Sequence, residues 1–142
     1  AQDVEQLGEL IDAELAQAAE RSAPFELQLK GAGAFGGADP HALWIGAAAN
    51  DALKQLASDC ERAARRAGLK PESRKFSPHV TLAYLNNADL ARVHAFESRL
   101  GLFETHPFLV EGFGLYSSHV RKGAPSLYRL EAEYPLRGWR SL

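Results

Sequence analysis

Apolar and polar residues recur along the chain with two different periods, which divides it into helices and strands. Between positions 3 and 20, apolar residues return at helical spacing with Gln, Glu and Asp on the other face, which predicts a first helix. Positions 25–30 alternate apolar and polar residues, as in a half-buried strand. Four glycines make 31–40 a predicted loop, and positions 42–46 form a short apolar strand.

The second half of the chain continues the same interleaving of helices and strands. Asn50 is placed to cap a helix that stops near Gly68, and Asn87 to cap another that ends near Leu100. Strands are predicted over 76–85, 106–116 and 127–134. Several strands follow one another through short connections, which favours an α+β domain with antiparallel sheet over a doubly wound parallel fold.

Composition adds limits on the class of protein. The 142 residues suit one domain spanning 1–142, with no obvious linker to divide it. A net charge of −2 does not indicate that the protein binds nucleic acid through its overall charge, but it is compatible with a local basic patch. Cys60 is the only cysteine and is expected to be a buried helix residue. With no signal peptide or long apolar span, the sequence favours a cytoplasmic protein without membrane contact.

The segment Phe76–Leu85 carries the most informative pair of residues, His79 and Thr81. Side chains two apart on a strand point to the same face, so an imidazole and a hydroxyl lie side by side. Histidine transfers protons near neutral pH, and threonine can donate to a phosphoryl oxygen. Val80 and Leu82 are expected to face a core. The alternative is a hydrogen-bonded histidine at a sheet edge beside an ordinary β-branched strand residue.

Other chemistry-bearing patterns are weaker. No histidine or cysteine spacing indicates a metal site, and no glycine motif indicates a phosphate loop or a cofactor. A basic cluster precedes the His79 strand, and it is either a solvated helix face or a positive rim for a phosphate backbone. Its members are Arg62, Arg65, Arg66, Lys70, Arg74 and Lys75. The polar run from Tyr116 to His119 at a strand end is placed to line a pocket.

Several short segments, in this order, resemble the two-histidine phosphoesterase superfamily and its bacterial RNA 2′,3′-cyclic phosphodiesterases, once called 2′-5′ RNA ligases. Phe76–Ala83 is close to that family's second H-x-T-x motif. The other matching segments are Ala23-Pro24-Phe25-Glu26-Leu27, Gly33-Ala34-Phe35, Leu43-Trp44, Phe113-Gly114-Leu115-Tyr116-Ser117-Ser118 and Glu133-Tyr134-Pro135-Leu136. Together they cover nearly the whole chain.

The resemblance implies a bilobal α+β fold of pseudo-symmetric halves with flanking helices, each half supplying one H-x-[ST]-x strand. The implied reaction opens the 2′,3′-cyclic phosphate of an RNA end or nucleotide to a 2′-phosphate, without metal or cofactor, in a monomeric enzyme. The reverse reaction would form 2′-5′ bonds. His79 would be the second-motif histidine, more readily the base, and Thr81 would hold a phosphate oxygen. Tyr84, Lys75, Tyr116 and Ser118 are expected to contact substrate.

The sequence departs from the family pattern at two points. The family often has arginine where Tyr84 stands, so Lys75, Arg74 or Arg121 would have to replace that cation. The first H-x-T-x motif and its strand are absent, the chain begins at Ala1, and it holds no methionine.

Because the first motif is absent, we expect an N-terminally truncated chain that is nearly inactive alone. The missing motif could lie outside this sequence or on another chain. Alternatively, the protein has lost catalysis and is a nucleotide- or RNA-end-binding module. An unrelated α+β domain is the remaining alternative.

Overall fold

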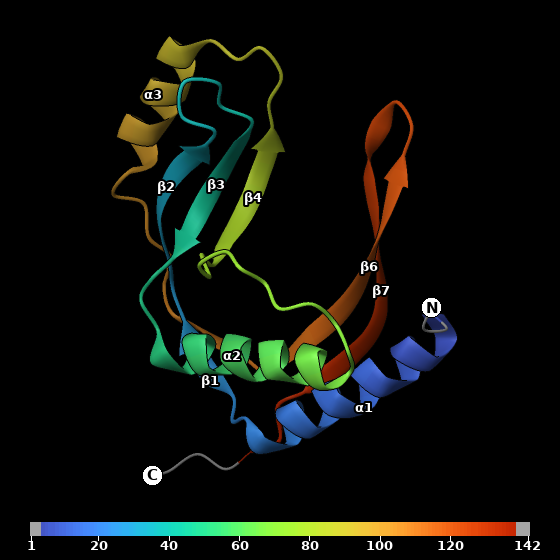
Figure 1. The fold of residues 1–142 in the computed structure, drawn as a ribbon. Coiled ribbons are helices and arrows are strands. Elements are labelled where there is room, and N and C mark those ends of the chain that lie inside the picture. Colours follow the sequence, from blue (N-terminus) through green and yellow to red (C-terminus); the bar gives the residue numbers. More distant parts are fainter. Residues whose placement is uncertain (1–3, 139–142) are drawn as a thin grey trace. The chain divides into compact units, whose positions relative to one another are not determined.

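A computed structural model describes residues 4–138, and Figure 1 shows the order of its helices and strands. In chain order the elements are α1 (Val4–Arg21), β1 (Phe25–Leu27), β2 (Leu29–Phe35), β3 (Ala42–Ala47), α2 (Asp51–Arg66), β4 (His79–Tyr84), α3 (Leu90–Leu100), β5 (Phe108–Val110), β6 (Gly112–Arg121) and β7 (Ala124–Pro135). The predicted helix start at Asp3 lies outside the described residues.

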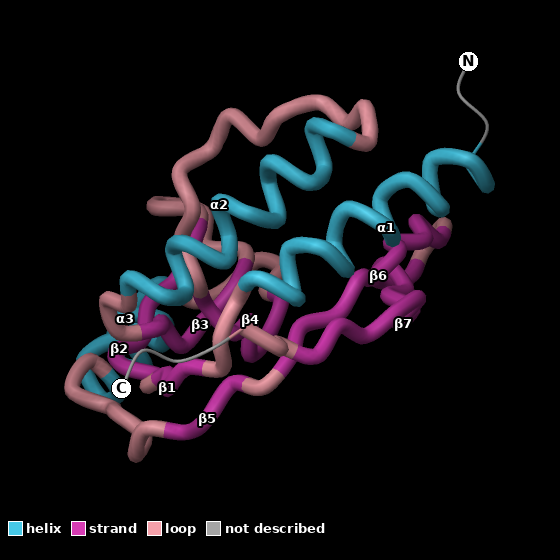
Figure 2. Tube along the Cα trace, turned by 90° about the horizontal axis from the view of Figure 1, so that it is seen from below, coloured by secondary structure: helices cyan, strands magenta, loops and turns pink. Residues whose placement is uncertain are grey.

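The α+β class with antiparallel sheet is confirmed. β2, β3 and β4 form one sheet in that order, β6 pairs with β7, and β1 pairs with β5. Figure 2 separates these strands from the helices by colour. The chain divides into two compact units. Unit 1 takes the described parts of 1–25, 54–73 and 110–142, and unit 2 takes 26–53 and 74–109.

Unit 1 is built on one face of the β6–β7 hairpin. Leu15 and Ala19 of α1, Ala63 of α2 and Tyr134 of β7 form its buried cluster. Phe113 lies opposite Tyr134 in the register, with ring centroids 5.1 Å apart. Removing this apolar surface from water is the main force that holds the two helices on the hairpin.

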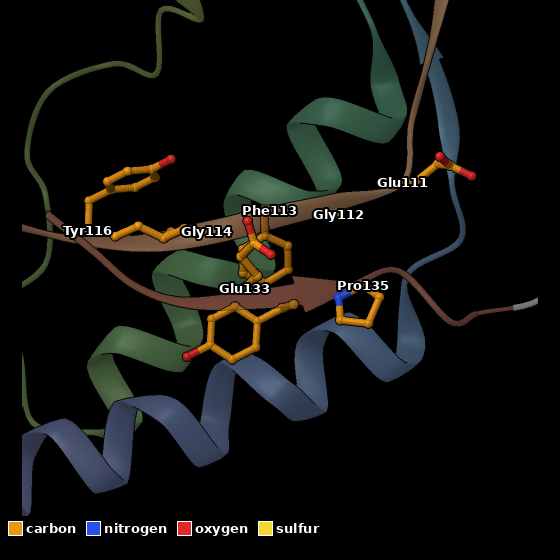
Figure 3. A pocket seen from close by; sticks show the side chains of 9 residues that line it. Glu111, Gly112, Phe113, Gly114, Tyr116, Glu133 and Pro135 are labelled. Carbon is orange, nitrogen blue, oxygen red and sulfur yellow. The ribbon is translucent and has the colours of Figure 1, made fainter.

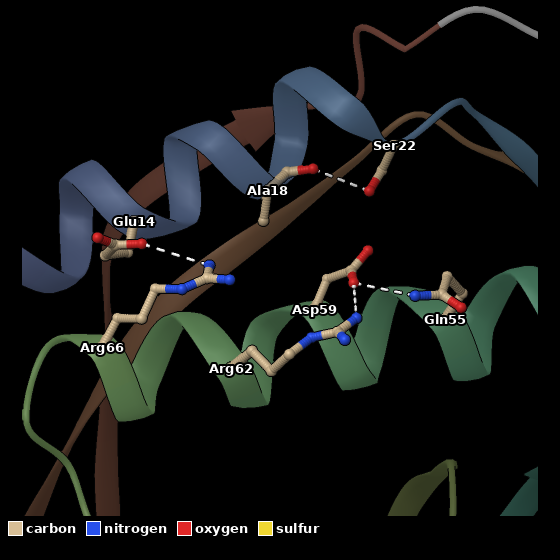
Figure 4. A network of polar contacts seen from close by, with 7 residues as sticks. All are labelled: Glu14, Ala18, Ser22, Gln55, Asp59, Arg62 and Arg66. Carbon is tan, nitrogen blue, oxygen red and sulfur yellow. Dashed lines mark hydrogen bonds and ion pairs between the residues drawn. The ribbon is translucent and has the colours of Figure 1, made fainter.

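Polar contacts join the same elements of unit 1. Tyr134 is only 5% exposed, and its hydroxyl donates to Asp12 Oδ1 over 2.6 Å. Burial and then this hydrogen bond hold the Tyr134 pKa above its ordinary value. Arg66 Nη1 of α2 lies 3.6 Å from Glu14 Oε2 of α1, as Figure 4 shows. These contacts join α1 to β7 and α1 to α2.

Cys60 lies in helix α2, as the sequence predicts, but it is partly rather than fully buried. It packs against the unit 1 cluster, and burial together with the neighbouring Asp59 charge raises its pKa to about 11. A thiol reacts as its thiolate, which this environment suppresses. We therefore expect Cys60 to react with a disulfide reagent at pH 8 about 100-fold more slowly than free cysteine. The rate should rise to the free value in denaturant, and fast reaction of the native protein would contradict this placement.

Unit 2 holds the three-stranded sheet, with α3 packed against β2. Ala42 and Ile45 of β3 and Val93 of α3 are buried. The Asn50 side chain accepts from the Leu53 backbone over 2.9 Å, so the predicted cap of α2 is confirmed. The predicted cap of α3 is wrong. Asp89 accepts from the Ala91 backbone instead.

Other boundaries also differ from the predicted ones. Asn87, expected as the α3 cap, takes a left-handed φ of 51° in the turn before that helix. Strand β2 runs through the glycines at 31 and 33 to Phe35, so only part of the predicted 31–40 loop is a loop. Strand β6 continues past Tyr116 to Arg121 and pairs with β7, so the polar run there lies within a long hairpin.

Candidate functional site

Strand β4 places His79 and Thr81 on one face of the unit 2 sheet. The strand lies at the edge of that sheet and pairs only with β3 among the described strands. Gly46 lies opposite His79, and Trp44 lies opposite Thr81. Cross-strand partners share a face, so both side chains stand on the same side as the indole. The i, i+2 spacing therefore brings the imidazole and the hydroxyl together as predicted.

A backbone hydrogen bond sets the orientation of the exposed His79 ring. Its Nδ1 lies 2.6 Å from the carbonyl oxygen of Ser77. A carbonyl only accepts hydrogen bonds, so Nδ1 carries the proton in this contact. In the neutral ring, Nε2 is then the unprotonated nitrogen. The ring is therefore held in the tautomer that a general base needs, with Nε2 directed away from its own backbone.

One aromatic ring, that of Phe35, packs against the His79 ring within unit 2, and two further rings pack against Phe35. The Phe35 ring meets His79 edge to face, with centroids 4.9 Å apart, and lies 5.6 Å from Trp44. His41 stacks on Phe35 at 6.5 Å. His41 belongs to the loop before β3, as expected, but its contact with Phe35 was not anticipated. The packing restricts the rotation of the His79 side chain from one side.

Two glycines make room for the Trp44 indole. A Cβ built on Gly33 would overlap Trp44 Cζ2 and lie 2.8 Å from Cη2, and one on Gly46 would lie 3.2 Å from Cζ3. The indole therefore lies flat across the backbone of β2 and β3. Its Nε1 is buried and has no hydrogen-bond partner among the described residues. The sequence indicates Leu43-Trp44 only as a segment that resembles the family, and the nearby glycines are the signal for this packing.

A β-bulge at Leu82 changes which residues share the His79 face. Thr81 pairs with Trp44 and Ala83 with Leu43, so Leu82 is the extra residue on β4. Beyond the bulge, Tyr84 pairs with Ala42, which lies on the same face as Trp44. Strict alternation would have placed Tyr84 on the opposite face from Thr81. The bulge thus brings Tyr84, which is 70% exposed, onto the face of His79 and Thr81.

The expectation that Val80 and Leu82 face a core is wrong for the described residues. Val80 is 46% exposed and Leu82 is 52% exposed. Val80 shares a face with the buried Ile45, but β4 is an edge strand, and an edge position is covered from one side only. Leu82 is displaced by the bulge.

Half of the basic cluster is an ion-paired helix face. Arg62 lies 2.6 Å from Asp59, and Arg65 lies 3.6 Å from Glu61, both within α2. With the Arg66 pair to Glu14, three of its six members bind carboxylates, which supports the solvated-face interpretation. Lys75 is exposed in the segment before β4. No described contact joins it to His79, so its role as the replacement cation stays a prediction.

Tyr116 and Ser118 lie in unit 1, on one face of β6. They pair with Leu130 and Tyr128, and the glycine at 114 shares their face. Ser117 and His119 stand on the other face. Ser117 donates to Glu131 Oε1 over 2.6 Å and lies 2.9 Å from His119 Nε2. The predicted polar run is thus divided between two faces of the hairpin. The hydrogen bond between Ser117 and Glu131 does not follow from the sequence, because Glu131 is the extra residue of a β-bulge in β7.

The geometry of unit 2 supplies a base and a hydroxyl donor on one exposed face. Among residues 4–138, no three His, Cys, Asp or Glu side chains gather as a metal site. No helix in the same range is long and apolar enough to span a membrane. Both findings concern the described part of the chain.

Comparison with known proteins gives one family. A sequence profile of the 2′-5′ RNA ligase superfamily matches residues 2–122. The RNA 2′,3′-cyclic phosphodiesterase of Aeropyrum pernix is 29% identical over 137 residues, covering 89% of this chain and 78% of that protein.

Solved structures share the fold. TT0787 of Thermus thermophilus superposes with a TM-score of 0.64 at 24% identity, covering 99% of this chain and 75% of its own. E. coli LigT complexed with 3′-AMP gives a TM-score of 0.62 at 22% identity, covering 95% of this chain and 71% of its own.

Proposed function

The chain belongs to the 2′-5′ RNA ligase superfamily, and we propose that it opens 2′,3′-cyclic phosphates of RNA ends or nucleotides to 2′-phosphates. The observation that carries this proposal is the His79–Thr81 pair with Nδ1 of His79 held by the Ser77 carbonyl. The relative from Aeropyrum pernix is named an RNA 2′,3′-cyclic phosphodiesterase, and the E. coli neighbour was solved with a nucleotide. The first name supports a cyclic phosphodiester as substrate, and the second supports binding of a nucleotide.

In the proposed step, water attacks the phosphorus and the bond from phosphorus to O3′ breaks. Nε2 of His79 takes the proton of the attacking water, since Nδ1 is already protonated. A second group must give a proton to the leaving O3′, which becomes a hydroxyl while the phosphate stays on O2′. With a 5′-hydroxyl in place of water, the same step would form a 2′-5′ bond.

Thr81 and Tyr84 are proposed to hold the phosphate. Both stand on the face of His79, and both carry a hydroxyl that can donate to a non-bridging oxygen. Donors fixed before the reaction stabilise the charge that develops on those oxygens. The family that the chain resembles often has arginine at the position of Tyr84. The neutral tyrosine hydroxyl is expected to bind phosphate more weakly than arginine would.

The step requires two proton-transfer groups, and His79 supplies one of them. No histidine besides His79 is followed by Ser or Thr two residues later. A positioned acid or base contributes about 10²–10⁴-fold in rate. We propose that a histidine outside this sequence supplies the acid, and that the present chain alone turns over slowly. We also propose that the enzyme is independent of metal, since two proton-transfer groups suffice for the step. Its proposed location is the cytoplasm, and its proposed state is a monomer.

Hydrolysis of 2′,3′-cyclic AMP in excess chelator tests the proposal. We expect turnover with adenosine 2′-phosphate as the product, identified by phosphorus NMR. Adenosine 3′-phosphate would mean that the other ester bond breaks and that the assignment of the leaving oxygen is wrong. Loss of turnover in chelator would replace the histidine mechanism by a metal-dependent one.

The single H-x-T pair favours one alternative, a nucleotide- or RNA-end-binding module without catalysis. Such a module would bind 2′,3′-cyclic AMP and leave it intact. Adding back a segment with a second H-x-T motif separates the two functions. An enzyme would gain turnover, whereas a binding module would gain affinity alone.

A further inference from the structure

The β6–β7 hairpin of unit 1 has a face that its own helices leave uncovered. The opposite face carries Phe113 and Tyr134 into the core. On the uncovered face, Tyr116 is 59% exposed, Tyr128 is 60% exposed and Leu130 between them is 42% exposed. The register pairs Tyr116 with Leu130 and Tyr128 with Ser118, so all three side chains share this face. Two aromatic rings thus stand on one small sheet with an apolar residue between them.

Beside Tyr116 this face is hollowed, as Figure 3 shows. The hollow has a volume of about 590 Å³, within the range of sites for small organic ligands. Its lining includes Tyr116, Leu130 and Glu133 of this face, the glycines at 112 and 114 and Glu111, and it extends to Phe113 and Tyr134 of the opposite face. A Cβ on Gly114 would lie 2.8 Å from Leu130 Cδ1 and 3.0 Å from Tyr116 Cε2. The ring edge of Tyr116 therefore lies directly over a glycine.

The charges of the hollow select the kind of ligand. Glu133 lies opposite Gly114 in the register and so stands on the hollowed face, and Glu111 lies at the end away from Tyr116 (Figure 3). Two carboxylates repel a phosphate, but each accepts hydrogen bonds from N–H groups. An aromatic ring beside them provides a surface for a flat ring. The combination fits a neutral planar heterocycle with an exocyclic amino group better than an anion.

We propose that this hollow binds an unpaired nucleobase, stacked on Tyr116 with its exocyclic amino group donating to Glu133. The inference rests on the proposed function, because it places a base of the RNA whose end carries the cyclic phosphate. Stacking on aromatic side chains is how unpaired RNA bases are commonly held. Adenine, cytosine and guanine carry such an amino group, whereas uracil does not. Among the four RNA bases, the hollow would thus discriminate against uracil.

Binding of two nucleosides that differ by one group tests the proposal. Adenosine and purine riboside have the same rings, but purine riboside lacks the amino group. Measured by calorimetry on the whole chain, adenosine should bind about tenfold more tightly. Glu133→Leu should abolish this preference and leave purine riboside unchanged. Equal binding of both nucleosides to the unaltered protein would overturn the role of Glu133.

A second set of variants tests stacking. Tyr116→Ala should weaken adenosine binding by about 5- to 100-fold, and Tyr116→Phe should keep it. Leu127→Ala is the matched control, because Leu127 is 46% exposed on the other face of the same hairpin and should have no effect. Unchanged binding by Tyr116→Ala, at an unchanged melting temperature, would overturn the proposal. Tighter binding of arginine amide than of adenosine would overturn it too, by assigning the hollow to a peptide side chain.

These outcomes are separable from the proposed function. Nucleosides carry no phosphate, so their binding is independent of His79. If 2′,3′-cyclic AMP is opened through His79 while Tyr116→Ala keeps its full affinity for adenosine, the proposed base site is wrong and the proposed hydrolysis stands. If adenosine binds as expected and no cyclic phosphate is opened, the base site stands and the hydrolase assignment fails.

Discussion

Replacing His79 by alanine lowers kcat for opening of 2′,3′-cyclic AMP by about 10²–10⁴-fold, the usual effect of losing a positioned proton-transfer group. KM changes little, because the phosphate is held by hydroxyl donors on the same face rather than by the imidazole. The side chain is exposed, so its removal leaves the sheet intact. Initial rates followed by separation of the 2′-phosphate product give both constants.

His94→Ala is the matched control for this change. His94 is an exposed histidine of α3 in the same unit, and the register of the site does not involve it. Its variant should keep the rate of the unaltered protein. An equal loss in both variants, or none in His79→Ala, would remove His79 from the mechanism.

Replacing Gly33 by alanine destabilises the protein by about 1–3 kcal/mol, because the new methyl group overlaps the Trp44 ring. The indole has to move, and it packs against Phe35, whose edge meets His79. A shift of about 1 Å in a catalytic group is enough to lower a rate about 10²-fold. We therefore expect the variant to lose activity beyond what its unfolded fraction explains. Chemical denaturation and initial rates at a temperature where the protein is folded separate the two effects.

Gly8→Ala is the opposite case in the same chain. Gly8 lies in α1, and a Cβ there meets nothing within 4 Å. Alanine should stabilise the helix by about 0.5–1 kcal/mol through its better helix propensity and leave activity unchanged. If Gly33→Ala behaved like Gly8→Ala, the packing of Trp44 on the β2 backbone would not be needed for the site.

The sequence contained enough information for the elements whose signals are local. The cap of α2 at Asn50 and the face shared by His79 and Thr81 both follow from spacing within one segment. The cap of α3 was assigned two residues early, since Asn and Asp serve equally as caps and turn residues. Local rules do not decide between two such candidates in one turn.

The features that sequence reasoning missed depend on pairing between distant segments. The Leu82 bulge is defined only by its register against β3, and it decides that Tyr84 joins the face of His79. Phe35 is near His79 only because β3 lies between their strands. The glycines on which the Trp44 ring lies are 11 positions before it and two after it, and only the sheet brings them together. No periodicity along the chain contains this information.

Opening of a cyclic phosphate to a 2′-phosphate by the His79 face can be tested in one reaction. The most direct measurement is a single-turnover reaction, with protein in excess over an RNA that ends in a 2′,3′-cyclic phosphate, in chelator. The unaltered protein and a His79→Asn variant are followed side by side. We expect the unaltered protein to form the 2′-phosphate end and the variant to do so at least about 10²-fold more slowly. Equal rates in the two proteins, or RNA bound but never opened, would contradict it.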